Sequence, residues 1–351
     1  MPDTGNVPFM TPALRADRRL AARIAVVVPC YRVRDQVLDV LRAMPDYVSR
    51  IYCVDDDCPQ SSGDHIEANC TDSRITVIRH AQNQGVGGAM VTGYRAALTD
   101  DADLVVKVDG DGQMNPALIA LFVEPILSGE ADYTKGNRFY RPESVHGMPI
   151  MRLYGNAMLS LMSKLSTGYW QTFDPNNGYT AVHANVLALL PMEKLARGYF
   201  FEADMLFRLS TVRAAVVDIP IDAIYGREKS SLKISRVAMP MLAGHVRNFF
   251  KRLFYAYYLR DFNVASIEWL LGPALLAFGV LFGVAEWWRS TTSGEVASAG
   301  TVMLAALPIL IGFQMLLSAI NFDVQNVPRQ SIHAHLDRSS AAAVPRRDDN
   351  H

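Results

Sequence analysis

Two long, uncharged apolar runs near the C-terminus constrain the fold of this chain more than any other feature. They extend from Trp269 to Ala285 and from Val302 to Ile320, and Gln314 is the only strongly polar side chain in the second run. As helices rising about 1.5 Å per residue they would be roughly 26–28 Å long, close to the ~30 Å hydrocarbon core of a bilayer. We therefore expect two membrane-spanning helices. Two buried helices of a large soluble domain are the alternative.

The residues that flank the two runs predict their orientation. The connecting turn has Arg289 as its only basic residue and begins with Trp287 and Trp288, as in an interfacial aromatic belt. The stretch 245–262 alternates aromatic and basic residues, which fits a helix in the membrane interface or an amphipathic helix packed on a soluble domain. The basic flanks predict that both ends of the hairpin are cytoplasmic. Their residues are Arg247, Lys251, Arg252 and Arg260 before the first run, and Arg329, Arg338, Arg346 and Arg347 after the second.

The preceding part of the chain predicts an α/β domain with a mostly parallel, doubly wound sheet. Short apolar runs such as 24–28 and 104–108 are typical of buried parallel strands, and helix-like stretches such as 88–98 separate them. The predicted divisions are a flexible N-terminus (1–22), the α/β catalytic domain (23–235), juxtamembrane amphipathic helices (236–262), a two-helix transmembrane hairpin (263–325) and a disordered C-terminal tail (326–351).

Composition excludes several classes of protein. Hydrophobic residues make up 50% of the chain and charged residues 20%, so a large core can form and a disordered chain is excluded. The formal charge of −1 gives no sign of nucleic-acid binding. The four cysteines include no Cys-x-x-Cys pair and lack the density of a secreted disulfide scaffold, so we expect reduced thiols in a cytoplasmic compartment.

The sharpest chemical signal is the acidic sequence that follows the predicted strand 104–108. Asp109 and Asp111 lie two residues apart, and Gly110 between them allows a tight backbone turn. Two carboxylates at a strand end can converge on one hard cation, and Gln113 can add a carbonyl oxygen. Mg²⁺ and Mn²⁺ prefer oxygen ligands of this kind and share them with phosphates. The pattern predicts a metal–diphosphate site.

Two weaker signals lie on neighbouring elements. Asp55, Asp56 and Asp57 follow the second predicted strand, where a carboxylate could bind a ribose or a base; a solvated acidic turn is the alternative. The segment 83–88 (Asn-Gln-Gly-Val-Gly-Gly) opens a helix and looks like a phosphate-cradling loop. Close packing of the helix start on the sheet explains its glycines equally well.

Taken in order, the motifs resemble those of a family-2 glycosyltransferase with the glycosyltransferase A fold. The later motifs, with the two terminal runs, resemble the polyprenyl-phosphate sugar synthases of the dolichyl-phosphate mannose synthase type, over roughly residues 23–325. The motifs are VVVPCY (26–31), VDDD (54–57), NQGVGGA (83–89), DGDGQ (109–113), GNRF (136–139), DPNNGYTA (174–181), FEADML (201–206) and YGREKSSLKI (225–234).

This resemblance implies inverting transfer of a sugar from a UDP- or GDP-linked donor to undecaprenyl or dolichyl phosphate, with Mg²⁺ or Mn²⁺, in cell-envelope polysaccharide synthesis. It also implies a multi-pass protein of the cytoplasmic (inner) membrane, with a cytoplasmic catalytic domain and a capacity to form homo-oligomers. The implied nucleotide contacts are Pro29, Tyr31, Asp55, Asp56, Asp109, Arg227 and Lys233. The implied metal ligands are Asp109, Asp111 and Gln113. The implied acceptor-phosphate contacts are Arg138, Arg152 and Asn156.

Glu202 and Asp204 join Asp111 as candidate catalytic residues. If the acceptor were a hydroxyl, an aspartate at this place in the family would be the general base. A phosphate acceptor is already ionised near neutral pH, so the acidic pair would then position the acceptor or pair with an arginine. A helix-start acid that interacts with the helix dipole is the structural alternative.

Two departures from the family pattern leave the donor open. Tyr31-Arg32-Val33 stands where the family often has Tyr-Asn-Glu, and the segment 225–234 differs from that of the mannose synthases. The main alternative function is transfer to a hydroxyl of a lipid-linked saccharide in cell-surface polysaccharide synthesis, for which Asp204 would be indispensable. A processive synthase is disfavoured because the chain has no Gln-x-x-Arg-Trp sequence. An inactive scaffold is disfavoured by the intact acidic motif at 109–113.

Overall fold

The computed structural model describes residues 21–140, 150–222 and 234–336, which form two compact units. The first unit comprises residues up to Asn248 together with the segment that starts at Pro328, and the second comprises Phe249–Val327. The unit boundary lies within one continuous helix, α9 (Ile234–Leu253).

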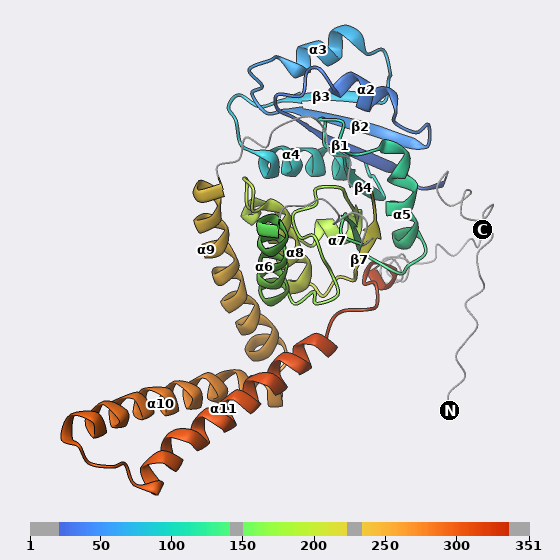
Figure 1. The fold of residues 1–351 in the computed structure, drawn as a ribbon. Helices are drawn as coiled ribbons and strands as arrows, with labels where there is room; N and C mark the ends of the chain where they lie inside the picture. Colours follow the sequence, from blue (N-terminus) through green and yellow to red (C-terminus); the bar gives the residue numbers. More distant parts are fainter. Residues whose placement is uncertain (1–20, 141–149, 223–233, 337–351) are drawn as a thin grey trace, which may run out of the picture. The chain divides into compact units, whose positions relative to one another are not determined.

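A seven-stranded sheet forms the centre of the first unit (Figure 1). The strand order is β3-β2-β1-β4-β6-β5-β7; β6 is antiparallel to β4 and β5, and the other neighbours are parallel. The predicted mostly parallel α/β sheet is therefore confirmed. The strands are β1 (Ile24–Cys30), β2 (Val48–Asp55), β3 (Ile75–Arg79), β4 (Leu104–Lys107), β5 (Tyr133–Asn137), β6 (Thr180–His183) and β7 (Val216–Pro220).

Helices cover both faces of this sheet because its strands are apolar on both sides (Figure 1). Ile24, Val26 and Val28 of β1 point into a buried cluster with side chains of α2, α3 and α5. On the opposite face Val27 packs against α4, and a Cβ at Gly93 would overlap the Val27 side chain. The helices of this unit are α2 (Val37–Arg42), α3 (Ser62–Asn69), α4 (Val86–Thr99), α5 (Ile119–Leu127), α6 (Ile150–Thr167), α7 (Ala184–Ala188) and α8 (Phe201–Thr211), together with most of α9.

The second unit contains two long helices, α10 (Val264–Ser293) and α11 (Ala299–Gln325), after a π-helical stretch at Phe254–Arg260. Both are long and apolar enough to cross a membrane, and only 11% of the most apolar window of each is buried. They are therefore not the buried core helices of a soluble domain. Glycines let the two helices approach each other, since a Cβ at Gly312 would lie 2.6 Å from the carbonyl oxygen of Gly272.

A buried ion pair lies within the second unit. Arg252 donates through both terminal nitrogens to the carboxylate of Asp323, at 2.7 and 2.9 Å. Both side chains are buried, as is that of Tyr257. The Tyr257 hydroxyl donates to the same carboxylate at 2.6 Å. Asp323 lies near the end of α11, so this cluster joins the segment before the hairpin to its last turn.

The chain returns to the first unit after α11, contrary to the predicted disordered tail from residue 326. The backbone N–H groups of Ile332 and His333 donate to the Asp132 carboxylate at 3.0 Å each, and His333 Nδ1 lies 2.8 Å from it. The His333 ring stacks on that of His183 at a centroid distance of 4.2 Å. The prediction is wrong for this segment because Asp132 is fully buried and needs N–H partners that come from 200 residues later.

Candidate active site

The carboxyl ends of β1 and β4 form the centre of the candidate site. These strands are neighbours. From β1 the chain adds β2 and β3 on one side, and then returns to place β4 on the other side of β1. A reversal of this kind is the switch point at which open α/β sheets bind ligands. Tyr31 follows β1 there, and Asp109 follows β4.

The acidic turn after β4 is built by its own short-range contacts. The Asp109 N–H group donates to Met114 Sδ at 3.2 Å, and the Gln113 N–H group donates to Asp111 Oδ1 at 3.0 Å. Gly112 has a φ of +76°, a left-handed conformation that favours glycine. Asp109 and Asp111 are half-buried and Gln113 is exposed, so a ligand can reach all three side chains.

These residues fit a divalent cation shared with a phosphate ligand. Among the described residues, no group of three or more His, Cys, Asp and Glu side chains forms a ready-made metal site. Asp109 and Asp111 supply two carboxylates at one strand end, which is the number that Mg²⁺ usually takes when phosphate oxygens complete its coordination. The donor set therefore suits a cation that arrives with a diphosphate better than a structural metal.

Lys107, the last residue of β4, is a component of the site that the sequence interpretation missed. Its buried Nζ lies 2.9 Å from Asp109 Oδ1 and 3.1 Å from Glu202 Oε1. Burial alone would lower the pKa of Lys107, but the two carboxylates outweigh burial and raise it. The signal was present in the sequence, since a lysine inside an otherwise apolar buried strand must find a partner.

Glu202 and Asp204 lie two residues apart on α8 but have different surroundings. Glu202 accepts a hydrogen bond from Lys107 and so lies beside the end of β4. Asp204 is fully buried and accepts hydrogen bonds at 3.0 Å each from the Ala196 N–H group and from Asn248 Nδ2. The structure thus brings Glu202, and not Asp204, to the Asp109 carboxylate.

The carboxylates of Asp55 and Asp56 are buried and bonded to the protein backbone. Asp55 accepts from the N–H groups of Cys58 and Gly63, at 2.8 and 2.6 Å. Asp56 accepts from the N–H groups of Gln84 and Gly85, at 2.8 and 2.7 Å, and its Oδ1 lies 2.7 Å from His80 Nδ1. The solvated acidic turn considered above is therefore wrong for both residues. In this structure they shape the loops around the predicted nucleotide site.

The glycines of the segment 83–88 serve close packing. The Gly87 N–H group donates to the Arg197 carbonyl oxygen at 2.8 Å, and a Cβ at Gly87 would overlap the Ala196 carbonyl oxygen. The start of α4 is thus pressed against the backbone that leads into α8. The packing interpretation accounts for Gly87, whose N–H group is already used.

Pro29 and Tyr31 form the β1 side of the predicted nucleotide site. Pro29 is half-buried in β1, and Tyr31 is 42% exposed just beyond it. Arg32, which departs from the family pattern, has a φ of +60° and lies over the Tyr31 ring at 5.3 Å. This residue therefore presents a guanidinium beside the aromatic ring.

Arg138, the first predicted acceptor contact, is held at the end of β5 by Asp174. Its Nε and one terminal nitrogen donate to the two carboxylate oxygens at 2.7 and 2.9 Å. Burial alone would raise the pKa of Asp174, but the Arg138 guanidinium and the other partners of this carboxylate outweigh burial and lower it. Arg138 is half-buried, so part of its surface remains open to a ligand.

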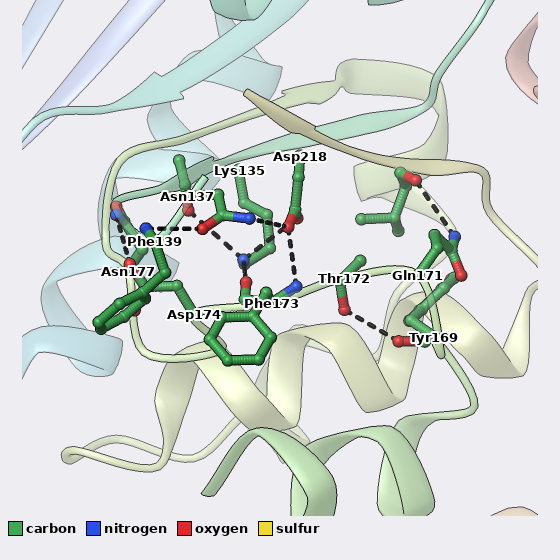
Figure 2. Close-up of polar contacts among 12 residues, drawn as sticks. Lys135, Asn137, Phe139, Tyr169, Gln171, Thr172, Phe173, Asp174, Asn177 and Asp218 are labelled. Carbon is green, nitrogen blue, oxygen red and sulfur yellow. Dashed lines mark hydrogen bonds and ion pairs between the residues drawn. The ribbon is translucent and has the colours of Figure 1, made fainter. Parts of the chain in front are cut away.

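A buried polar network around Asp218, close to Asp174, was not predicted (Figure 2). Lys135 Nζ donates to the Phe173 carbonyl oxygen and lies 3.3 Å from Asp218 Oδ1. Asn137 Nδ2 and the Phe173 N–H group donate to Asp218 Oδ2 at 2.9 and 2.8 Å. Burial lowers the pKa of Lys135 and raises that of Asp218. The network fixes β5, β7 and the segment that carries Asp174.

The other predicted phosphate contacts are described only in part. Arg152 and Asn156 lie one turn apart on α6; Asn156 is half-buried, and the Arg152 side chain is outside the described residues. Arg227 and Lys233 also lie outside them. Beside this position α6 exposes an apolar stripe, with Tyr154 69%, Met158 59% and Leu161 45% exposed.

The fold and the acidic strand end define the class of protein. Residues 25–188 match the family model described as "Glycosyl transferase family 2". The chain therefore contains a glycosyltransferase family 2 domain, with a glycosyltransferase A-like α/β fold.

The chain is also similar to individual relatives and solved structures. The chain is 33% identical over 152 residues to "UDP-N-acetylglucosamine--dolichyl-phosphate N-acetylglucosaminyltransferase" of Methanococcus voltae, which covers 43% of this chain and 60% of that protein. It is 27% identical over 217 residues to "Undecaprenyl-phosphate mannosyltransferase" of Micrococcus luteus, and the match covers 61% of this chain and 88% of that protein. The structure of glucosyl-3-phosphoglycerate synthase of Mycobacterium tuberculosis has been solved with Mn²⁺, UDP-glucose and phosphoglyceric acid. It matches this chain with a TM-score of 0.52 at 19% identity, and the match covers 71% of this chain and 86% of that one. This last likeness shows the shared fold.

Proposed function

We propose that this protein transfers a sugar, with inversion, from a UDP- or GDP-linked donor to a polyprenyl phosphate at the cytoplasmic face of a membrane. The observation that carries the proposal is the acidic end of β4, where Asp109 and Asp111 are open to a ligand within a family-2 domain. Relatives named for transfer to dolichyl and undecaprenyl phosphate support the acceptor class.

Different residues of the site would bind the cation and the acceptor phosphate. Asp109, Asp111 and Gln113 would hold a divalent cation, which when bound neutralises charge on the departing diphosphate. The acceptor phosphate oxygen attacks the anomeric carbon, and the bond from that carbon to the nucleoside diphosphate breaks. Arg138, held at a fixed angle by Asp174, would orient the acceptor phosphate. Much of the rate enhancement would come from this positioning.

A phosphate acceptor agrees with the surroundings of Asp204. Transfer to a hydroxyl needs a general base that can reach the acceptor. Asp204 is fully buried, and both of its oxygens are bonded within the protein. A phosphate oxygen is ionised near neutral pH and needs no such base, so this observation favours the polyprenyl phosphate over the lipid-linked saccharide.

The hairpin supports a membrane location with both of its ends on one side. The residues before and after the second unit both belong to the first unit. A chain that leaves a folded domain and returns to it must cross the bilayer an even number of times. This argument agrees with the basic flanks, which predict that the catalytic domain lies in the cytoplasm together with the nucleotide sugars. Association of hairpins into homo-oligomers stays a prediction.

A donor and acceptor panel tests the proposal. The full-length protein in detergent, with Mn²⁺ or Mg²⁺, would be given radiolabelled UDP- and GDP-sugars with undecaprenyl or dolichyl phosphate. We expect acid-labile label in the lipid phase with one donor, and none with Asp111→Asn. Asp39→Asn, which changes an exposed carboxylate on α2, is the matched control. Metal-dependent donor binding without lipid labelling would instead favour the hydroxyl acceptor.

A further inference from the structure

We propose that Lys107 is a positioning residue of the donor site, which fixes the Asp109 carboxylate and connects it to Glu202 on α8. The inference rests on the proposed function, because it concerns the metal and nucleotide end of β4. None of the sequence motifs considered above assigns a role to this lysine.

The burial of Lys107 indicates a specific use of its charge. Its side chain is 2% exposed, whereas those of Glu202 and Asp109 are 12% and 30% exposed. A buried ammonium loses its hydration, and a well-packed apolar residue would fill the same space without that loss. Here the ammonium lies within 3.1 Å of two carboxylates that are far apart in the sequence. It therefore joins the strand end to the helix start.

The ammonium also determines which oxygen of Asp109 can serve a ligand. Asp109 Oδ1 lies 2.9 Å from Lys107 Nζ, so that oxygen is held by the protein. The second oxygen, Oδ2, is left to contact a cation. Without the ammonium, Asp109 and Glu202 would be two like charges in a poorly hydrated place and would repel each other.

Gly178 gives independent support, because it makes the room that the ammonium occupies. A Cβ at this position would overlap Lys107 Nζ and would lie 2.9 Å from Asp109 Oδ2. The φ angle of Gly178 is not positive, so its backbone conformation does not call for glycine. The glycine of the 174–181 motif is thus explained by Lys107.

The test compares Mn²⁺ binding by variants of the full-length protein. Mn²⁺ would be titrated by electron paramagnetic resonance in the presence of UDP or GDP, whichever the unmodified protein binds. Loss of a residue that orients a metal ligand typically weakens metal binding about 10–100-fold, and we expect Lys107→Met to fall in that range. Lys194→Met, which removes an exposed lysine, is the matched control and should bind as the unmodified protein does.

A second substitution distinguishes positioning from support of the fold. Lys107→Met/Glu202→Gln removes the repulsion together with the ammonium, so we expect it to recover most of the lost affinity. Gly178→Ala keeps every charge but forces Lys107 Nζ and Asp109 Oδ2 out of their present arrangement, so it should weaken Mn²⁺ binding even if Lys107→Met does not fold. Thermal unfolding would be measured for each variant.

The outcomes separate this inference from the proposed function. If the unmodified protein fails to bind Mn²⁺ in the presence of either UDP or GDP, the proposed donor site is wrong and the inference falls with it. If it does bind, and folded Lys107→Met or Gly178→Ala binds Mn²⁺ within about twofold of it, only the inference is overturned, because loss of a residue that orients a metal ligand costs far more than that. A folded double variant as weak as Lys107→Met would also overturn it.

Discussion

Arg138 and Asp174 face each other as a two-pronged ion pair, with the Arg138 Nε and one terminal nitrogen on the two oxygens of the carboxylate. The aspartate is almost fully buried and the arginine is not. This asymmetry means that Asp174 fixes the direction in which the guanidinium presents its remaining surface. Lysine, with a single ammonium, cannot reproduce the two parallel contacts.

We therefore predict that Arg138→Lys raises the KM for polyprenyl phosphate about tenfold or more while the donor KM changes little, since loss of one charge-assisted hydrogen bond is worth about 1.5–3 kcal/mol. Steady-state kinetics with each substrate varied in turn would measure the change. Arg42→Lys, which alters an exposed pair on α2, is the control. Equal effects on both KM values would remove Arg138 from the acceptor site.

Asp111→Asn should abolish metal-dependent transfer and leave the fold intact. Asp111 is half-buried, and its Oδ1 accepts from the Gln113 N–H group of the same turn, which an asparagine oxygen can also do. We expect a loss of activity of about 100-fold or more, because loss of one preorganised electrostatic group costs roughly that much. Activity and thermal unfolding would be measured together. Normal turnover by this variant after metal removal would contradict the metal assignment.

Asp132 should make stability depend on pH in the acid range. Burial alone would raise the pKa of Asp132, but hydrogen bonds from His333, Ile332 and Ala215 outweigh it and lower the pKa. Because the folded-state pKa is below the unfolded value of about 3.9, the stabilisation is fully present above that pH and is lost as the pH falls through the folded pKa.

The corresponding measurement is chemical unfolding of the full chain in detergent at a series of pH values. Asp132→Asn should cost about 1–3 kcal/mol at neutral pH, because buried N–H donors lose an ionised acceptor. The difference between the two proteins should shrink below about pH 4. A difference that does not vary with pH would contradict this account.

Gly93 and Gly155 form a matched pair for testing the packing of the sheet. A Cβ at Gly93 would overlap Val27, so Gly93→Ala should destabilise the first unit by about 1–3 kcal/mol. Nothing lies within 4 Å of a Cβ at Gly155 on the surface of α6, so Gly155→Ala should stabilise by about 0.4–1 kcal/mol. Denaturant unfolding measures both. Similar effects of the two substitutions would show that the packing of α4 on β1 is looser than described.

The proposed topology can be tested with two single cysteines. Val296 lies in the turn between α10 and α11 and is 96% exposed, and Arg329 follows α11. In intact cells a membrane-impermeant maleimide should label Val296→Cys and not Arg329→Cys, because the basic flanks predict that only the turn lies outside. The four native cysteines are buried or half-buried, which keeps the background low. Labelling of both positions or neither in intact cells would contradict a two-span hairpin.

The sequence predicts most of the fold because its signals are local. The apolar run at 24–28 is β1 extended to Cys30, and the run at 104–108 is β4 at Leu104–Lys107. The start of β2 at Val48 is not evident from the pattern, since Ser49 and Arg50 interrupt the apolar run; Val48 and Arg50 belong to the strand because they pair with Ile24 and Ala25 of β1. Long apolar helices and acidic turns are likewise visible without tertiary context.

The parts of the site that the sequence does not reveal depend on contacts between distant residues. The positions of Asp109 and Asp111 follow from the end of one strand, whereas the link from Lys107 to Glu202 joins residues 95 apart. The spacing of Glu202 and Asp204 does not tell which of them lies at the site, because the helix directs one toward Lys107 and the other toward α9. The network around Asp218 has no short motif at all, since β5, β7 and the 173–177 segment each supply one side of it.

The bond between Asp132 and His333 sets an order of events during synthesis. The acceptor is made early, and its N–H partners follow about two hundred residues later, beyond both apolar helices. While the ribosome is still producing α10 and α11, the first unit has all its strands but lacks this last segment. Until that segment is made, the Asp132 carboxylate keeps the N–H group of Ala215 and lacks those of Ile332 and His333. The first unit is thus completed only after both apolar helices have been synthesised.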